Sequence, residues 1–243
     1  MGTKIEWTEE TWNPITGCTK FSAGCEHCYA AVFARRLQAM KCPRYENGFK
    51  VTVHRDLFEK PLRWKKPKMV FVNSMSDLFH DDVPEEDILS IFATMNAASQ
   101  HTFQVLTKRS KRLVELSSKI NWTNNIWMGV SVENKEAIQR CEDLKITGAK
   151  IKFISAEPLL ESISDINLDG IDWLIVGGES GPQSREMEET WVIELRDLAK
   201  EKDIPFFFKQ WGGVRKKANG SELHGMYYKE YPKIQVIDHD SKP

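Results

Sequence analysis

Short apolar runs alternate with amphipathic segments along most of this chain, and this alternation limits the possible folds more than any other feature. Six runs of five or six residues are rich in β-branched or aromatic side chains and end in polar residues or glycine: 69–73, 102–107, 126–131, 150–155, 173–177 and 205–209. Apolar runs without a polar face are typical of strands buried on both sides of a parallel sheet. A further short strand is predicted at 12–17.

Helical periodicity marks the segments between these runs: 29–40, 85–99, 110–119, 135–144 and 188–202. In segment 29–40 the spacing predicts that Val32, Phe33 and Leu37 face the interior. Repeated strand–helix alternation predicts an α/β fold with right-handed crossovers. Six to seven parallel strands in 243 residues favour a partial or complete (β/α) barrel, and an open doubly wound sheet is the alternative.

The sequence predicts one main domain at 1–215, with a cysteine-bearing loop at 17–29 and an irregular insertion at 41–68, followed by a polar C-terminal extension at 216–243. A hydrophobic content of 41% excludes a disordered chain. The net charge of −1 excludes nucleic-acid binding through bulk positive charge. Because no apolar stretch approaches the length of a membrane span and the first ten residues lack a signal-peptide core, we expect a cytoplasmic protein without a membrane partner.

Three of the five cysteines lie within eleven residues. Cys18, Cys25 and Cys28 form a C-x6-C-x2-C motif between the first predicted strand and the first predicted helix. In a reducing compartment such clustering indicates metal or redox chemistry rather than disulfides. Three thiolates alone favour an iron–sulfur cluster with one open coordination position, whereas a structural zinc ion needs a fourth ligand. The candidates for that ligand are His27, Cys42, His54 and His80.

Polar residues follow nearly every predicted strand. In parallel α/β folds the carboxyl ends of the strands meet at one edge, where functional residues collect. The candidates at this edge are Asn73, Ser74, Ser76, Asp77, Lys108, Ser131, Glu133, Glu157 and Glu179. Each alone is compatible with a helix cap or an ion pair, but their convergence on one edge predicts a binding or catalytic site.

Several motifs together resemble a known family. WNPITGC, GCEHCYA, FVNSMSDLFH, VLTKR, GVSVEN, SAEPLL, GGESG and FFFKQWG, spread over 6–213, are similar to the phage-associated three-cysteine-motif (DUF5131-type) family of the radical S-adenosylmethionine-like superfamily. The resemblance implies that Cys18, Cys25 and Cys28 hold a [4Fe–4S] cluster whose fourth iron binds S-adenosylmethionine. It also implies an enzyme that generates a 5′-deoxyadenosyl radical and receives electrons from an external donor such as flavodoxin or ferredoxin.

The resemblance also implies which residues contact the cofactor. His27 occupies the position where the superfamily commonly has a larger aromatic residue against adenine, and Tyr29 follows the third cysteine. The strand-end residues from Asn73 to Glu179 named above complete the expected cofactor site. The sequence departs from the superfamily in the six residues between the first two cysteines, where three are usual, and in Asn73–Asp77, where a Gly-Gly-Glu run is common.

A cluster of basic residues suggests a substrate class. The insertion carries six cations against two acids, interleaved with Phe58 and Trp64: Arg55, Lys60, Arg63, Lys65, Lys66 and Lys68. Basic and aromatic side chains together suit the phosphates and bases of DNA or RNA, although a solvated loop has the same composition. We therefore expect a nucleic-acid substrate near the cysteine loop. Two alternatives stay open: a zinc-stabilised nucleic-acid-binding module without catalysis, and a cluster protein that acts with a partner protein.

Overall fold

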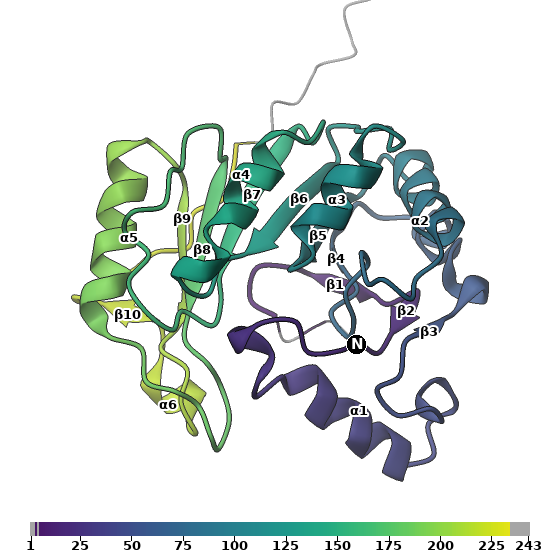
Figure 1. Ribbon diagram of the computed structural model, residues 1–243, viewed down its shortest axis with the longest axis horizontal. Coiled ribbons are helices and arrows are strands. Elements are labelled where there is room, and N and C mark those ends of the chain that lie inside the picture. The colour runs from purple at the N-terminus through teal and green to yellow at the C-terminus, as the bar shows by residue number, and fades with distance from the viewer. Residues whose placement is uncertain (1–2, 4, 234–243) are drawn as a thin grey trace, which may run out of the picture.

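The computed structural model describes residues 3 and 5–233. Seven parallel strands form one curved sheet and lie in it in the order of the sequence (Figure 1): β1 (Glu10–Trp12), β4 (Met69–Val72), β5 (Thr102–Thr107), β6 (Ile126–Ser131), β7 (Ile151–Ala156), β8 (Trp173–Gly177) and β9 (Phe206–Gln210). The strand order never reverses, so the sheet lacks the switch point of a doubly wound fold. The fold is therefore a partial (β/α) barrel, which confirms the predicted class.

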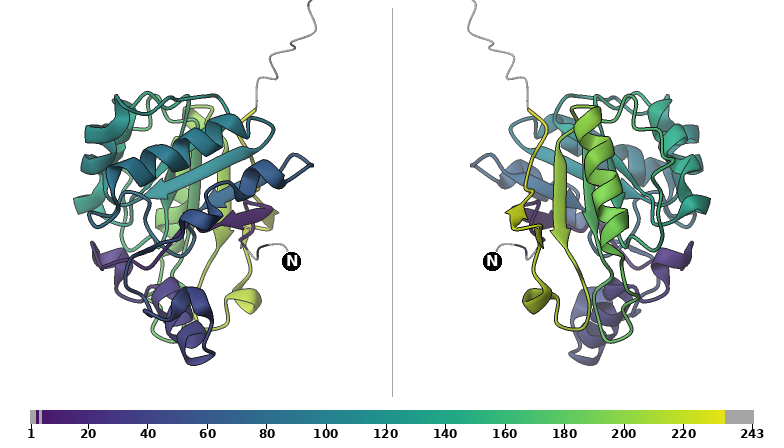
Figure 2. Two further views of the ribbon diagram at one scale, coloured as in Figure 1. Left: turned by 90° about the vertical axis from the view of Figure 1, so that its right-hand side faces the viewer. Right: turned by 90° about the vertical axis from the view of Figure 1, so that its left-hand side faces the viewer.

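Helices cover one face of this sheet. The helices of the chain are α1 (Tyr29–Ala39), α2 (Glu85–Ala97), α3 (Ser110–Ser117), α4 (Gln139–Lys145), α5 (Glu189–Glu201) and the short α6 (Lys216–Asn219). Helices α2 to α5 form the outer layer (Figures 1 and 2), whereas α1 lies apart from it, beyond the carboxyl ends of the first strands. No described helix connects β7 to β8, which are joined by the irregular segment 157–172.

Short elements complete the chain. Strand β2 (Ile15–Thr16) pairs antiparallel with β3 (Thr52–Val53), and β10 (Glu222–Leu223) pairs with β11 (Met226–Tyr227). Single 3-10 turns lie at η1 (Ala23–Cys25), η2 (Pro43–Tyr45), η3 (Arg55–Leu57), η4 (Lys60–Arg63) and η5 (Lys135–Ala137). After the β10–β11 hairpin the chain returns along β9, where Phe208 N donates to Tyr228 O. No helix among the described residues has the length and apolar character needed to cross a bilayer.

Side chains of each strand alternate between two separate cores, as the pleat of a strand requires. In β6, β7 and β8, residues such as Met128, Ile154 and Leu174 pack under the helices. The intervening residues point to the inner face, where aromatic rings dominate a second core: Trp7, Phe71, Trp127, Phe153, Trp173, Ile175 and Phe207. The inner face of the half-barrel is therefore filled with rings and does not form an open channel.

Toward the carboxyl ends of the strands, the side chains on the inner face change from aromatic to polar. On β7 the inner face continues with Ser155, two residues beyond the Phe153 ring, and on β6 it continues past Trp127 and Gly129 with Ser131. Lys209 follows Phe207 in the same way on β9. Because inward positions recur every second residue, an aromatic floor lies below a polar layer at the carboxyl edge. This layer is where the structure collects its candidate site.

Two local predictions are wrong. The strand expected at 12–17 is divided, because Pro14 cannot donate a backbone hydrogen bond, and residues Ile15–Thr16 leave the sheet to pair with β3. Helix α1 buries Ala30 and Ala34, while Val32 and Phe33 face outward with 60% and 47% of their surface exposed. The spacing of apolar residues identified the helix, but it did not identify the side that packs.

We predict that Gly129→Ala destabilises the fold, because a Cβ at this position would lie 2.4 Å from Cε2 of Phe153. The Phe153 ring is fully buried between Trp7 and Trp173, so it has little room to move. Overpacking of this kind costs about 1–3 kcal/mol in free energy of unfolding, measurable by urea denaturation. In a Phe153→Leu background the same substitution should cost less, and equal costs in both backgrounds would contradict this explanation.

Candidate functional site

The cysteine loop, residues 17–29, crosses the carboxyl edge of the half-barrel and enters α1. It begins at Gly17, whose φ of 84° and close approach to Lys50 O, 2.1 Å from an ideal Cβ, exclude any side chain. The Gly17 N–H donates to Met75 O, which attaches the start of the loop to the segment after β4. Cys18, Cys25 and Cys28 are all half-buried and free of disulfides.

The donor chemistry of this loop fits an iron–sulfur cluster. Three thiols on one partly exposed loop are the soft ligand set that such clusters use. In the described part of the chain no three His, Cys, Asp or Glu side chains converge closely enough to hold one ion as they stand. Burial, together with the charge of Asp77, raises the pKa of the Cys18 thiol to about 11, although the Arg109 guanidinium opposes this shift.

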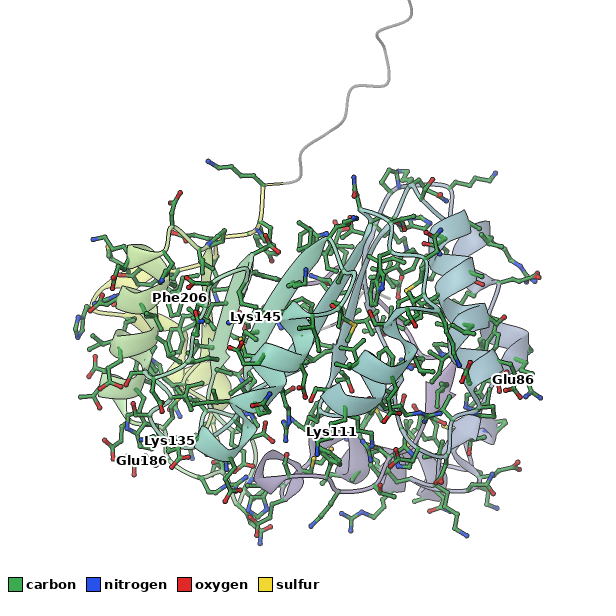
Figure 3. All side chains as sticks on the ribbon, turned by 45° about the horizontal axis from the view of Figure 1, so that its top comes forward. Glu86, Lys111, Lys135, Lys145, Glu186 and Phe206 are labelled. Carbon is green, nitrogen blue, oxygen red and sulfur yellow. The ribbon has the colours of Figure 1, made fainter. Side chains whose placement is uncertain are left out.

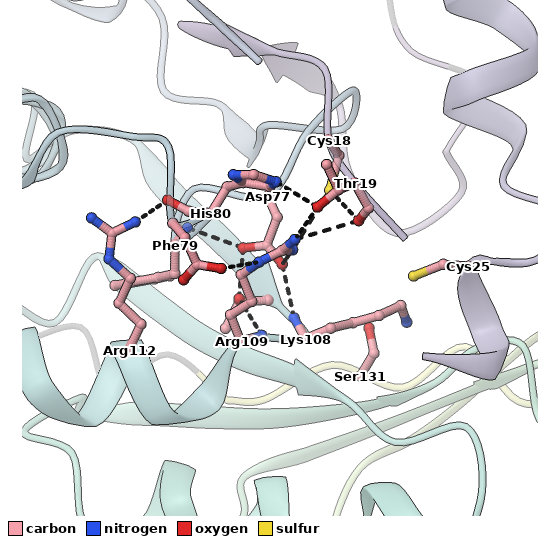
Figure 4. Close-up of polar contacts among 12 residues, drawn as sticks. Cys18, Thr19, Cys25, Asp77, Phe79, His80, Lys108, Arg109, Arg112 and Ser131 are labelled. Atoms are coloured by element: carbon pink, nitrogen blue, oxygen red, sulfur yellow. Dashed lines mark hydrogen bonds and ion pairs between the residues drawn. The ribbon is translucent and has the colours of Figure 1, made fainter. Parts of the chain in front are cut away.

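A buried arginine attaches the first part of the loop to the sheet (Figure 4). Arg109, at the end of β5, donates from Nη1 to Cys18 Sγ at 3.6 Å and from Nη2 to Thr19 Oγ1 at 3.0 Å. Asp77 balances its charge, with 3.3 Å between Asp77 Oδ2 and Arg109 Nη1. The Asp77 carboxylate also accepts hydrogen bonds from the Thr107 hydroxyl and the Lys108 N–H. Asp77 and Arg109 therefore form one rigid support under Cys18.

A second acid–arginine pair lies under the middle of the loop. Glu133 is fully buried and accepts from Arg140 Nη1 at 2.7 Å, while Lys108 Nζ lies 3.7 Å away. The Ser22 hydroxyl donates to the same carboxylate, and Gly24 lies so close that a Cβ would sit 2.8 Å from Glu133 Oε1. Burial opposes ionisation, but the charges of Lys108 and Arg140 outweigh it and hold the pKa of Glu133 below its ordinary value.

A third pair holds the loop at Ala23 and Glu26. Glu179, just after β8, forms a bidentate pair with Arg185, at 2.9 Å to Nε and 2.7 Å to Nη2. Arg185 then reaches the cysteine loop, donating to Ala23 O at 2.9 Å and to Glu26 Oε2 at 3.2 Å. Arg185 and the other nearby groups hold the pKa of Glu179 below its ordinary value, despite the opposing effect of its burial.

Three of the acids predicted to contact a cofactor also support the cysteine loop. Asp77, Glu133 and Glu179 each bind an arginine, and two of these arginines donate directly to the cysteine loop. Sequence reasoning missed Arg140 and Arg185, because neither belongs to a motif and each lies on a different connection. The guanidinium groups of Arg109 and Arg140 also lie 5.0 and 5.5 Å from the ring of Phe21, in the same loop.

The polar layer of the inner face holds other predicted residues. Glu157, after β7, pairs with Lys209 Nζ at 2.9 Å and accepts from the Ser155 hydroxyl at 3.1 Å. Gly177 leaves room for this carboxylate, since a Cβ there would lie 2.6 Å from Glu157 Oε1. Ser131 occupies the inner face of β6, and its carbonyl accepts from Arg140. These side chains form a charged and hydroxylated surface at the carboxyl edge.

The residues after β4 shape the backbone beside this surface. Asn73 is buried with φ of 58°, and its Oδ1 accepts from Ile15 N. The Ser76 hydroxyl donates to Ile15 O, and the Ser74 carbonyl accepts from the Tyr29 hydroxyl at 2.5 Å. The segment after β4 therefore connects the short strand β2 to the first turn of α1. His27 lies half-buried within the cysteine loop.

Two of the four candidate fourth zinc ligands are engaged elsewhere. His80 uses both ring nitrogens, accepting from Asp82 N at Nδ1 and bonding Thr19 Oγ1 at Nε2. His54 is bonded to Thr16. Cys42 precedes η2 after α1, and Cys141 is a buried residue under the outer helices, as its helical pattern predicts.

The last part of the basic insertion lies away from the cysteine loop. Lys68 directly precedes β4 and pairs with Glu10 at the start of β1, 2.9 Å between Nζ and Oε2. Both positions lie at the amino edge of the sheet, opposite the cysteine loop. The neighbouring exposed cations are Arg63, Lys65 and Lys66.

Among the cations that follow β5, Lys111 is exposed at the start of α3 (Figure 3), while Arg112 donates to His80 O and Val83 O.

The fold is similar to solved structures of spore photoproduct lyase. A double mutant with bound AdoMet and dinucleoside spore photoproduct matches with a TM-score of 0.51 and 12% identity, over 81% of this chain and 62% of that chain. The lyase complexed with dinucleoside spore photoproduct gives 0.51 and 13% over the same shares. A single mutant gives 0.50 and 14%, over 84% and 63%. This chain spans less than two thirds of those structures, and the likeness is one of fold: a partial (β/α) barrel.

A family model covers residues 2–232. The chain belongs to the family described as protein of unknown function (DUF5131), which confirms the resemblance seen in its motifs. No curated protein is significantly similar to it in sequence.

We predict that Glu133→Gln lowers the free energy of unfolding by about 3 kcal/mol at pH 7, because it leaves the buried Arg140 charge without its partner. Since the folded-state pKa of Glu133 lies below its ordinary 4.5, its stabilisation is complete above that value and is lost as pH falls through the folded-state pKa. Urea denaturation between pH 3 and pH 7 should therefore show a smaller pH dependence in the variant. The half-exposed pair Glu142–Lys145 supplies the control, since Glu142→Gln should change stability by less than about 0.5 kcal/mol.

Proposed function

We propose that this protein is a radical S-adenosylmethionine-type enzyme that binds a [4Fe–4S] cluster through Cys18, Cys25 and Cys28. The observation that carries this proposal is the position of three free thiols on one loop, which acid–arginine pairs hold over the polar carboxyl edge of a half-barrel. The shared fold with spore photoproduct lyase, for which a structure holds AdoMet, supports it. When bound, the cluster and cofactor supply a 5′-deoxyadenosyl radical that abstracts hydrogen.

We assign the remaining roles to residues of this chain. The three cysteines hold the cluster, while Arg109, Arg140 and Arg185 position their loop. The polar layer, with Lys108, Ser131 and Glu157 on the inner face and Ser74, His27 and Tyr29 beside it, binds the cofactor. Opposite charges there suit a zwitterionic amino-acid group, because Lys108 attracts its carboxylate and Glu157 attracts its ammonium. The aromatic floor excludes water beneath the site.

The substrate in this proposal is a nucleic acid or one of its nucleotides. Support comes from the dinucleoside bound to the similar lyase. The exposed cations Arg63, Lys65 and Lys66 lie at the opposite edge, so the substrate meets the carboxyl edge through other residues. Phe21, whose ring is half exposed and held by two guanidinium groups, is the aromatic surface available to a base there.

We predict that protein purified anaerobically contains iron and sulfide, and that Cys18→Ala, Cys25→Ala or Cys28→Ala each abolishes the cluster. Loss of one of three thiolates leaves too few ligands to retain it. Cys42→Ala and Cys141→Ala are the controls and should retain iron. Iron is measured by metal analysis, and the cluster by the visible absorbance of its sulfur-to-iron charge-transfer bands. A colourless wild-type protein with one tightly bound zinc ion would overturn the proposal.

With dithionite as reductant, we expect slow cleavage of S-adenosylmethionine to methionine and 5′-deoxyadenosine, detected by chromatography. Glu157→Gln should weaken cofactor binding about tenfold by calorimetry, because one charge-assisted hydrogen bond is lost, while iron content stays unchanged. The exposed Glu136 supplies the control, since Glu136→Gln removes a carboxylate away from the polar layer. A reduced, iron-loaded protein that binds no cofactor would contradict the enzymatic assignment.

A further inference from the structure

The three thiols of the cysteine loop have unequal electrostatic surroundings. Arg109 donates from Nη1 to Cys18 Sγ at 3.6 Å (Figure 4). Within residues 3 and 5–233, neither Cys25 nor Cys28 accepts a hydrogen bond from a charged side chain, and Cys25 Sγ contacts only the neutral Ser22 hydroxyl, at 4.0 Å. A charged donor therefore reaches one of the three sulfurs and leaves the other two without one.

The guanidinium of Arg109 is shared between this sulfur and an acid. Arg109 is only 4% exposed, so water screens its charge weakly. Its Nη1 faces both Cys18 Sγ and Asp77 Oδ2, and the 3.3 Å to Asp77 exceeds the 2.7 Å of the other two acid–arginine pairs under the loop. The remaining Nε is buried without a hydrogen-bond partner, 3.9 Å from the exposed Asp81 carboxylate. Neither acid therefore takes up the full hydrogen-bonding capacity of the guanidinium.

The backbone beside the sulfur is held by separate bonds. Arg109 Nη2 donates to Thr19 Oγ1 at 3.0 Å, and His80 Nε2 bonds the same hydroxyl at 2.8 Å. Because Thr19 directly follows Cys18, these two bonds already anchor the start of the loop. The Nη1 donor at the sulfur is an additional contact, and it acts on the electron density of the atom that would bind iron.

We propose that Arg109 is a positioning residue that acts through Cys18 to raise the reduction potential of the cluster, while Asp77 limits the increase; this inference rests on the proposed function. Hydrogen bonds to the ligand sulfurs and the net charge around a cluster both set its potential. Uptake of one electron makes the cluster more negative, so a buried cation at one ligand stabilises the reduced form. A neutral side chain at position 109 would leave the cluster harder to reduce.

The test is a redox titration of the iron-loaded, full-length protein without S-adenosylmethionine. Dithionite supplies one electron per cluster, and electron paramagnetic resonance measures the reduced fraction at each solution potential. Arg109→Gln should lower the ratio of reduced to oxidised cluster at least tenfold, which is ~59 mV for a one-electron couple. A shift of this size is expected because one charge a few ångströms away outweighs a tenfold change in an equilibrium even at an effective dielectric constant of about 20.

Removal of the acid should have the opposite effect. Asp77→Asn keeps an oxygen that can accept from the Thr107 hydroxyl, but it leaves the cation unbalanced, so the ratio of reduced to oxidised cluster should rise. Arg109→Lys retains the charge and should shift the ratio less than Arg109→Gln. If Arg109→Gln does not fold because Asp77 stays buried and unpaired, the double variant Arg109→Gln/Asp77→Asn restores the balance of charge. Its ratio should then lie below that of Asp77→Asn.

Arg112 supplies a matched control, since it lies three residues further along and donates to the carbonyls of His80 and Val83 rather than to a sulfur. Arg112→Gln removes the same charge and the same kind of donor from this region. It should therefore change the ratio less than Arg109→Gln does, and an equal change would contradict a specific role for the bond to Cys18.

The outcomes separate this inference from the proposed function. An iron-loaded protein whose ratio is unchanged in both single variants, or shifts in the same direction in both, would overturn the role of Arg109 and leave the cluster in place. Loss of iron in Arg109→Gln with an unchanged potential of the remaining cluster would assign Arg109 to anchoring the loop alone. A wild-type protein that assembles no cluster would instead refute the proposed function, and this inference with it.

Discussion

The pleat of seven parallel strands is the constraint on which the rest of the structure depends. Because side chains alternate along each strand, one set packs under the helices and the other fills the inner face with rings such as Trp127, Phe153 and Trp173. The aromatic floor occupies the space that a complete barrel would enclose. Polar inner residues can then appear only toward the carboxyl ends, where Ser131 and Ser155 continue the same faces. The position of the candidate site follows from this geometry.

Acid–arginine pairs at the carboxyl edge hold the cysteine loop in a defined position. Three acids from three strand ends each bind one arginine. The two buried pairs, Asp77–Arg109 and Glu133–Arg140, are costly to break because the remaining charge stays desolvated. Arg109 donates to Cys18 and Arg185 to the backbone at Ala23, so the loop is attached near its start and at its middle. The thiols remain half-exposed while their backbone is held. A loop with this arrangement can present ligands to a cluster without being buried itself.

Helix α1 does not turn its large apolar side chains inward, as amphipathic helices of a monomer usually do. Its sequence contains the correct period for an amphipathic helix, yet the side with Val32 and Phe33 faces solvent and the side with Ala30 and Ala34 packs against the protein. Small residues permit close packing of the helix beside Met75. Departures from local consistency of this kind are expected at functional surfaces. The exposed apolar side of α1 lies directly beside the cysteine loop. We therefore regard helix α1 and the loop as parts of one functional edge.

The sequence by itself determined the class of fold, the loop of three cysteines and the edge at which polar residues collect, because strand runs, helical periods and close cysteine spacing are local patterns. It also placed β5, β6 and β8 with their observed bounds. Only the tertiary structure decided that Asp77, Glu133 and Glu179 hold arginines, since Arg140 and Arg185 approach them from separate connections. It likewise decided that the basic insertion reaches the amino edge, because a chain segment's charge does not specify which end of the sheet it borders.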